Sequence, residues 1–118
     1  MLQKYYVLVG LGGFLGSIVR GFAAKFIPFN AHSFSWATFC LNMLGSFFIG
    51  IILLNPNENI KAFWSIGFLG GLTTFSGLAL ELLNYFNSKQ YALMAVYGIS
   101  SLILGFALIW LGQKLASF

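Results

Sequence analysis

Long apolar stretches dominate this chain, and they limit its possible folds more than any other feature. Of its 118 residues, 59% are hydrophobic and only 7% are charged, whereas soluble domains carry about 25% charged residues. A membrane-spanning helix needs about 20 mostly apolar residues, and four segments qualify: residues 5–26, 34–54, 62–86 and 91–111. We therefore predict an all-α, multi-pass protein of the cell membrane, with a single four-helix domain covering residues 1–118.

The basic residues do not favour one orientation in the membrane. Four spans leave both termini on the same side, so three basic residues lie on that side and three on the other: Lys4, Lys61 and Lys114 against Arg20, Lys25 and Lys89. An excess of Lys and Arg normally sets orientation. Two interpretations stay open: a chance balance, or dual topology, in which copies insert both ways up and pair antiparallel. No run of basic residues forms a nucleic-acid patch, so nucleic acid is not an expected partner.

The third apolar segment is interrupted near its middle by GGLTTFSGL, residues 70–78. Glycine and threonine are poor helix formers, and non-helical backbone at membrane depth survives only where it lines a cavity or is buried in protein. We predict two half-helices joined by a break, with a continuous, glycine-packed helix as the alternative. Carbonyl groups freed at such breaks bind ions in other membrane proteins, and they would suit a hard cation such as sodium.

Polar side chains form a stripe on the second segment. Thr38, Asn42 and Ser46 recur every fourth residue and therefore share one helix face. The Asn42 amide offers two donors and an acceptor, although a simple interhelical hydrogen bond worth about 1 kcal/mol would also explain it. In the fourth segment, Tyr97 and Ser101 are again four residues apart.

Arg20 and Glu81 are the charged residues that we single out within the spans. Arg20 could anchor the first span at the interface, or it could concentrate anions at a pore mouth. Glu81 could reach the interface or pair with a hydroxyl group. The chain has no aspartate, and its one histidine, His32, lies in an expected loop. A hydrolytic set of side chains therefore cannot be assembled in the membrane, and we expect no enzyme activity.

Small residues are spaced for close helix packing. Gly12 and Gly16 form a GxxxG motif in the first span, and Gly98, Gly105 and Gly112 repeat every seven residues in the fourth. In lipid, such residues let helix backbones approach each other. Four short helices enclose little interior volume, so an ion pathway would form more easily with a second copy of the chain.

Three motifs resemble the Fluc (CrcB) family of fluoride channels. GGFLGSIVR (residues 12–20) is similar to the family's GGxxGAxxR, and ATFCLNMLGSFFIG (residues 37–50) is similar to GTLxxNxxGSFxxG. GFLGGLTTFSG (residues 67–77) is similar to GFxGGxTTFST. The motifs occur in the family's order and spacing, and the four-span length extends the resemblance over essentially the whole chain.

The resemblance implies an antiparallel, dual-topology homodimer with two pores, which exports fluoride passively and so lowers cytoplasmic fluoride. It also implies a structural Na⁺ at the dimer centre, held by backbone carbonyl groups at the positions of Gly70 and Thr73. Two groups of site residues follow from these motifs and the polar stripe. The expected fluoride pathway contains Asn42, Phe75, Tyr97, Ser101, Thr38, Ser46 and Leu78, and the expected vestibule contains Arg20 and Glu81.

One position departs from the family pattern. A second pore phenylalanine is expected at position 78, but this chain has Leu78, preceded by Gly77 where threonine is usual. The edge of an aromatic ring is positive and can face an anion, whereas leucine has no such edge. Either the pore tolerates an apolar group here, or the chain is one subunit of a heterodimeric channel that needs an unlike partner.

Two other functions stay open at this point. A small dual-topology exporter of the multidrug type would share the size and topology, but it would need a membrane-embedded carboxylate, for which Glu81 is a poor candidate. A structural or assembly subunit without transport activity of its own would also fit Gly77 and Leu78.

Overall fold

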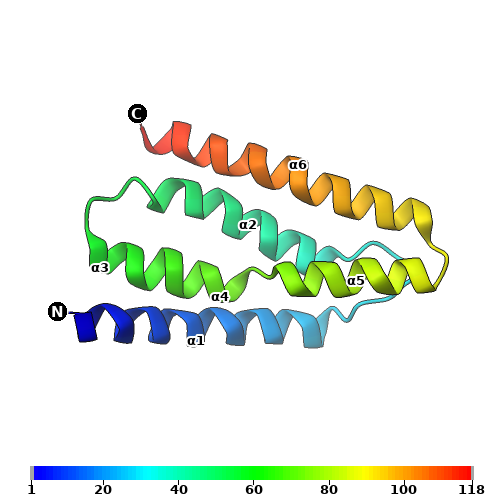
Figure 1. The fold of residues 1–118 in the computed structure, drawn as a ribbon, viewed down its shortest axis with the longest axis horizontal. Helices are drawn as coiled ribbons and strands as arrows, with labels where there is room; N and C mark the ends of the chain where they lie inside the picture. Colours follow the sequence, from blue (N-terminus) through cyan, green and yellow to red (C-terminus); the bar gives the residue numbers. More distant parts are fainter. Residues whose placement is uncertain (1, 118) are drawn as a thin grey trace.

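Four helical rods lie side by side in the structure, a computed structural model that describes residues 2–117 (Figure 1). The first two rods are α1 (Leu2–Phe26) and α2 (Trp36–Ile52), and the fourth is α6 (Tyr91–Ala116). The third is built from consecutive pieces: α3 (Glu58–Ile60), the π-helical segment η1 (Lys61–Leu69), α4 (Gly70–Leu72) and α5 (Phe75–Asn87). The predicted all-α fold is confirmed.

Three of the rods are long and apolar enough to cross a membrane: α1, the third rod and α6. With 17 residues, α2 is shorter, about 26 Å at 1.5 Å per residue. It begins at Trp36 rather than at the expected residue 34, since the Trp36 N–H turns back to the Phe34 carbonyl oxygen, 2.9 Å away. A length of 17 residues is at the lower limit for a spanning helix.

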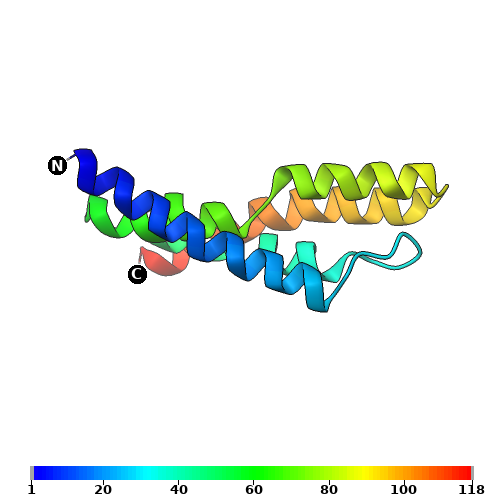
Figure 2. The same ribbon diagram turned by 90° about the horizontal axis from the view of Figure 1, so that it is seen from below.

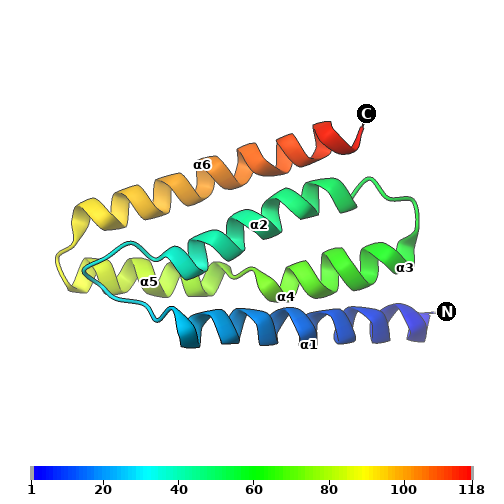
Figure 3. The same cartoon turned by 180° about the vertical axis from the view of Figure 1, so that it is seen from behind.

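The ends of the rods are arranged as four spans require. Both ends of the chain and the α2–α3 loop lie at one end of the bundle, and the α1–α2 loop and the α5–α6 turn lie at the other (Figures 1 and 3). At that second end, the Tyr85 hydroxyl donates to the Ser33 carbonyl oxygen at 2.7 Å. His32 and Gln90 are also hydrogen bonded, with 3.2 Å between Nδ1 and Nε2. These contacts tie the long α1–α2 loop to the third rod and to the turn.

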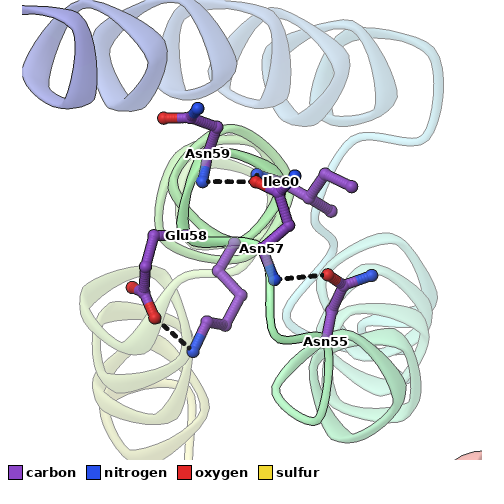
Figure 4. Close-up of polar contacts among 6 residues, drawn as sticks. Asn55, Asn57, Glu58, Asn59 and Ile60 are labelled. Atoms are coloured by element: carbon purple, nitrogen blue, oxygen red, sulfur yellow. Dashed lines mark hydrogen bonds and ion pairs between the residues drawn. The ribbon is translucent and has the colours of Figure 1, made fainter.

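The third rod starts in a polar turn whose sequence explains its geometry (Figure 4). The Asn57 side chain accepts hydrogen bonds from the backbone N–H groups of Asn59 and Ile60, at 2.9 and 3.2 Å, and so caps the helix. The Asn55 side chain accepts from the Asn57 N–H at 2.8 Å. Such caps satisfy N–H groups that have no partner within the helix.

Glycines bring α1 and the third rod into backbone contact. A Cβ atom on Gly12 would collide with the Phe63 carbonyl oxygen, and one on Gly16 with the Phe68 carbonyl oxygen. The expected close packing through GxxxG is therefore confirmed, here between helices of one chain. Gly112 of α6 is similarly closed in by the α2 backbone.

The predicted break in the third rod is confirmed at Thr73 and Thr74. Their backbone is extended, with φ/ψ of −87°/157° and −150°/123°. Before the break, η1 and α4 pack on α1, and after it α5 packs on α6 (Figure 2). The break therefore moves the third rod from one neighbour to another. The π-helical geometry of η1 was not predicted, and π-helical turns occur often near functional sites.

Candidate functional site

The side chain of Asn42, on α2, holds the break through two hydrogen bonds to one residue. Its Oδ1 accepts from the Thr74 N–H at 2.8 Å, and its Nδ2 donates to the Thr74 carbonyl oxygen at 3.2 Å. These two backbone groups would otherwise lack partners at membrane depth, where an unsatisfied group is costly. Since one N–H of the amide is used by Thr74, the second N–H stays available to another acceptor.

Further contacts fix the two helix ends that meet at the break. Arg20, on α1, donates from Nε to the Gly71 carbonyl oxygen at 2.9 Å and so caps the first half. The Thr73 hydroxyl donates back to the Leu69 carbonyl oxygen at 2.9 Å. On the other side, the Thr74 Oγ1 accepts from the Gly77 N–H at 2.9 Å and caps α5. The break is therefore a defined structure held by α1 and α2.

These contacts release two backbone carbonyl groups. In a continuous helix, the Thr74 N–H would bond to the Gly70 carbonyl and the Gly77 N–H to the Thr73 carbonyl. Here the two N–H groups bond to Asn42 and to the Thr74 hydroxyl instead. Within residues 2–117 no other hydrogen bond reaches either carbonyl. Carbonyl oxygens are ligands for a hard cation, and the same residues contain no His, Cys, Asp and Glu cluster that could hold a metal ion.

A cavity of about 220 Å³ lies beside the break, and we call it the break cavity. Its lining combines four of the expected pathway positions with the break itself: Asn42, Ser46, Ile49, Thr73, Thr74, Phe75, Leu78 and Ile109. None of these side chains is charged. Phe75 is 79% exposed and Leu78 only 8%, so Phe75 projects away from its own chain while Leu78 packs within it.

A second cavity, of about 240 Å³, contains both expected vestibule residues, and we call it the vestibule cavity. Its polar lining consists of Arg20, Thr38, Thr74, Glu81 and Asn84. Thr38 therefore lies in this cavity and not with Asn42 and Ser46. Among the described residues Arg20 and Glu81 form no ion pair with each other, although they line the same cavity.

Glu81 is the centre of a hydrogen-bond network that joins three helices. The Tyr97 hydroxyl of α6 donates to Oε1 at 2.6 Å, and the Thr38 hydroxyl of α2 donates to Oε2 at 3.1 Å. Hydrogen bonds to a carboxylate are stronger than those between neutral groups. Tyr97 is fully buried and lines neither cavity. Ser101 is also buried, and its Oγ has no partner among the described residues.

Thr74 is missing from the site residues that the sequence predicts, yet it lines both cavities. A signal for it exists in the sequence. A threonine followed by a helical segment is typical of an N-cap, and the paired threonines of the break contain one such position. The roles predicted for the other site residues stay predictions, because the geometry shows where they lie and not what they bind.

Comparison with known proteins gives a consistent result. Residues 7–113 match the family model described as "CrcB-like protein, Camphor Resistance (CrcB)". The chain is 38% identical over its full length to a protein of Azobacteroides pseudotrichonymphae named "Fluoride-specific ion channel FluC", of which 99% is covered. It is 39% identical to a protein of the same name from Thermus thermophilus, with 96% of this chain and 95% of the relative aligned. A Clostridium acetobutylicum relative named "Fluoride-specific ion channel FluC 2" is 37% identical, with 92% and 94% aligned.

Proposed function

This chain belongs to the CrcB family, and we propose that it is a fluoride-specific ion channel that lets fluoride leave the cell passively. It is a multi-pass membrane protein. Its relatives are named as ion channels, so the activity of the family is transport of an ion. Export down the fluoride gradient would lower cytoplasmic fluoride without an energy source.

The observation that carries the proposal is the uncharged, donor-bearing break cavity. Fluoride is small and strongly hydrated, so a pore must replace its water with close hydrogen-bond donors and still release the ion. The free N–H of Asn42, the Ser46 hydroxyl and the edge of the Phe75 ring supply such donors in one cavity. Because none of them carries a full positive charge, the cavity would bind fluoride without trapping it.

The vestibule cavity supplies the approach to this pathway. Arg20 retains guanidinium N–H groups beyond the one that it donates to Gly71, and its charge would raise the local concentration of anions. The Thr38 hydroxyl lies in the same cavity but donates to Glu81. We propose that Tyr97 and Ser101 act further along α6, where their positions match polar positions of the family.

A second copy of the chain, in the opposite orientation, is the partner that we propose. Phe75 projects away from the chain at the break, so one copy does not enclose the route on that side. The balance of three basic residues against three supports insertion in both orientations. Because Leu78 departs from the family pattern, a heterodimer with an unlike subunit stays the alternative. The Clostridium acetobutylicum relative has the number 2 in its name, FluC 2, which is consistent with this alternative.

We also propose that a structural Na⁺ binds at the dimer centre. The carbonyl groups of Gly70 and Thr73, freed by the break, would hold it together with the same groups of the second copy. Bound there, the cation would supply fixed positive charge beside the pathway and make nearby anions less costly. This chain's own contribution is to keep the carbonyls unpaired, through the Asn42 and Thr74 contacts.

The exporter alternative gains no support from Glu81. Both of its carboxylate oxygens accept hydrogen bonds from hydroxyl groups of the same chain, at 2.6 and 3.1 Å. A proton-coupling carboxylate must be free to take up and release a proton during transport.

The test is fluoride efflux from liposomes that contain the purified chain, with chloride efflux as the control. We expect rapid fluoride release and no chloride release from the chain alone. A folded dimer that releases no fluoride would refute the homodimeric channel, and fluoride release that appears only with a second, unlike subunit would establish the heterodimer.

A further inference from the structure

Thr74 stands where the two cavities of the site meet. Of the described residues that line the break cavity and the vestibule cavity, only Thr74 belongs to both linings. Its backbone is fixed on both sides by Asn42, so the residue cannot move aside easily. An ion that passes from one cavity to the other therefore passes this residue.

The Thr74 hydroxyl is placed to donate a hydrogen bond to an anion. A hydroxyl group has one donor and two acceptor lone pairs. One lone pair of Oγ1 is used by the Gly77 N–H at 2.9 Å, which leaves the hydroxyl hydrogen free. Ser76 Oγ lies 3.3 Å from Oγ1 and can exchange a hydrogen bond with it. Without an ion, the Thr74 hydroxyl can donate its hydrogen to Ser76 Oγ. With an ion, the hydroxyl can rotate and donate to the ion instead.

Gly77 leaves the room that this arrangement needs. A Cβ atom at position 77 would lie 2.6 Å from Cγ2 of Thr74 and 3.2 Å from its Oγ1. Any larger residue would therefore have to push the Thr74 side chain out of its present position. The glycine, which departs from the threonine of the family pattern, fits the observed position of the Thr74 side chain.

We infer that the Thr74 hydroxyl donates a hydrogen bond to fluoride as the ion passes between the two cavities, and that Gly77 keeps this hydroxyl in place. The inference rests on the proposed fluoride channel function and adds a contact residue to it. It separates two roles of one side chain: Oγ1 caps α5 by accepting, and its hydrogen serves the ion by donating.

The experiment compares fluoride efflux from liposomes for the full chain and three variants at position 74, each normalised to the amount of folded protein. Thr74→Ser keeps both roles, and Thr74→Val, which has nearly the same shape, removes both. Thr74→Asp keeps the cap, because a carboxylate accepts the Gly77 N–H, but at neutral pH it has no hydrogen to donate. The matched control is Ser100→Ala, which removes a hydroxyl of α6 that donates to the Tyr97 backbone carbonyl oxygen; Ser100 lines neither cavity.

We expect Thr74→Ser and Ser100→Ala to conduct like the unmodified chain, and Thr74→Val and Thr74→Asp to lose about tenfold or more in rate. Conduction by either of the last two at the unmodified rate would overturn the inference. If Thr74→Val does not fold, Thr74→Ala, which also lacks the hydroxyl and adds no charge, decides in its place, because Thr74→Asp adds a negative charge that repels fluoride in any case. Absence of fluoride release from the unmodified chain would instead count against the proposed function itself.

A second pair of variants tests Gly77 by a readout other than transport. Gly77→Ala should lower the melting temperature of the unmodified chain, because the new Cβ meets the Thr74 methyl group. In the Thr74→Ser background that methyl group is absent, so Gly77→Ala should lower the melting temperature clearly less. An equal loss in both backgrounds would overturn the role assigned to Gly77.

Discussion

Replacing Asn42 by alanine should weaken the whole site by loosening its break. The substitution removes both hydrogen bonds to Thr74: the one that its N–H donates to Oδ1 at 2.8 Å, and the one that its carbonyl oxygen accepts from Nδ2 at 3.2 Å. Alanine is a better helix former than asparagine, so α2 itself should stay intact. Any loss of stability therefore reports on the contact with the break.

The size of the loss follows from how deeply Thr74 is buried. A fully buried backbone group left without a partner costs about 1–3 kcal/mol. Interhelical hydrogen bonds in membrane proteins average only about 0.6 kcal/mol. Thr74 is half-buried and borders two cavities that are large enough for water. The lower end therefore applies, and we expect about 1 kcal/mol for each group, or about 2 kcal/mol in total.

The assay is the free energy of unfolding in mixed micelles with increasing denaturing detergent, followed by circular dichroism. Ser46→Ala is the matched control, since Ser46 lies one turn further on the same face of α2 and lines the same cavity. Ser46 is half-buried and, unlike Asn42, makes no contact with Thr74 among the hydrogen bonds of residues 2–117. We expect its loss to stay below about 0.5 kcal/mol.

A loss of free energy for Asn42→Ala as small as that expected for Ser46→Ala would refute this reasoning. It would mean that water replaces the Asn42 amide at Thr74 without cost. Fluoride efflux adds a second criterion, because a loosened break should also slow transport by Asn42→Ala at temperatures where the protein is still folded.

Three further predictions concern the contacts around the break. Glu81→Gln should lower the free energy of unfolding by less than about 1 kcal/mol, because the amide oxygen still accepts a hydrogen bond from one hydroxyl group, whereas Glu81→Leu should lower it by about 2 kcal/mol. Chemical unfolding of both variants checks this. Fluoride efflux should persist in Glu81→Gln. Arg20→Leu should lower stability by about 1 kcal/mol, because the hydrogen bond to the Gly71 carbonyl oxygen is lost. It should also slow fluoride entry, most strongly at low salt, which efflux measured at two ionic strengths would show. An unchanged salt dependence would contradict the vestibule role. Gly16→Leu should cost about 3 kcal/mol or more, because a side chain would collide with the Phe68 backbone, and gel filtration of the purified protein would show lost or aggregated material.

The fold could be predicted from the sequence because its main constraint is a property of long segments. Apolar runs of about 20 residues specify spanning helices almost regardless of detail. The break at residues 73–74 was also predictable, since glycine and threonine lower helix stability where the sequence around them raises it. The π-helical geometry of η1 had no such signal, because it depends on how η1 packs against α1.

The sequence predicted many of the residues that line the site, but fewer of the hydrogen bonds between them. Asn42, Ser46 and Phe75 do come together in one cavity, as helix periodicity and the motifs suggested. The partner of Asn42 is backbone, however, and periodicity describes only side chains. The pairing of Tyr97 with Glu81 joins residues 16 positions apart on different helices, which no spacing rule could supply.

Leu78 changes which groups of the break cavity can face an anion. Its side chain is 8% exposed and lines the break cavity beside Asn42, so it takes the place of a ring whose edge could face an anion. If leucine offers fluoride no donor, the donors that remain in and beside that cavity must carry more of the dehydration. Thr74 caps the same half-helix one turn before Leu78, and Gly77 leaves its hydroxyl in place. Gly77 and Leu78 can thus be read as linked departures: the pore loses an aromatic edge at one position and keeps a hydroxyl one turn away.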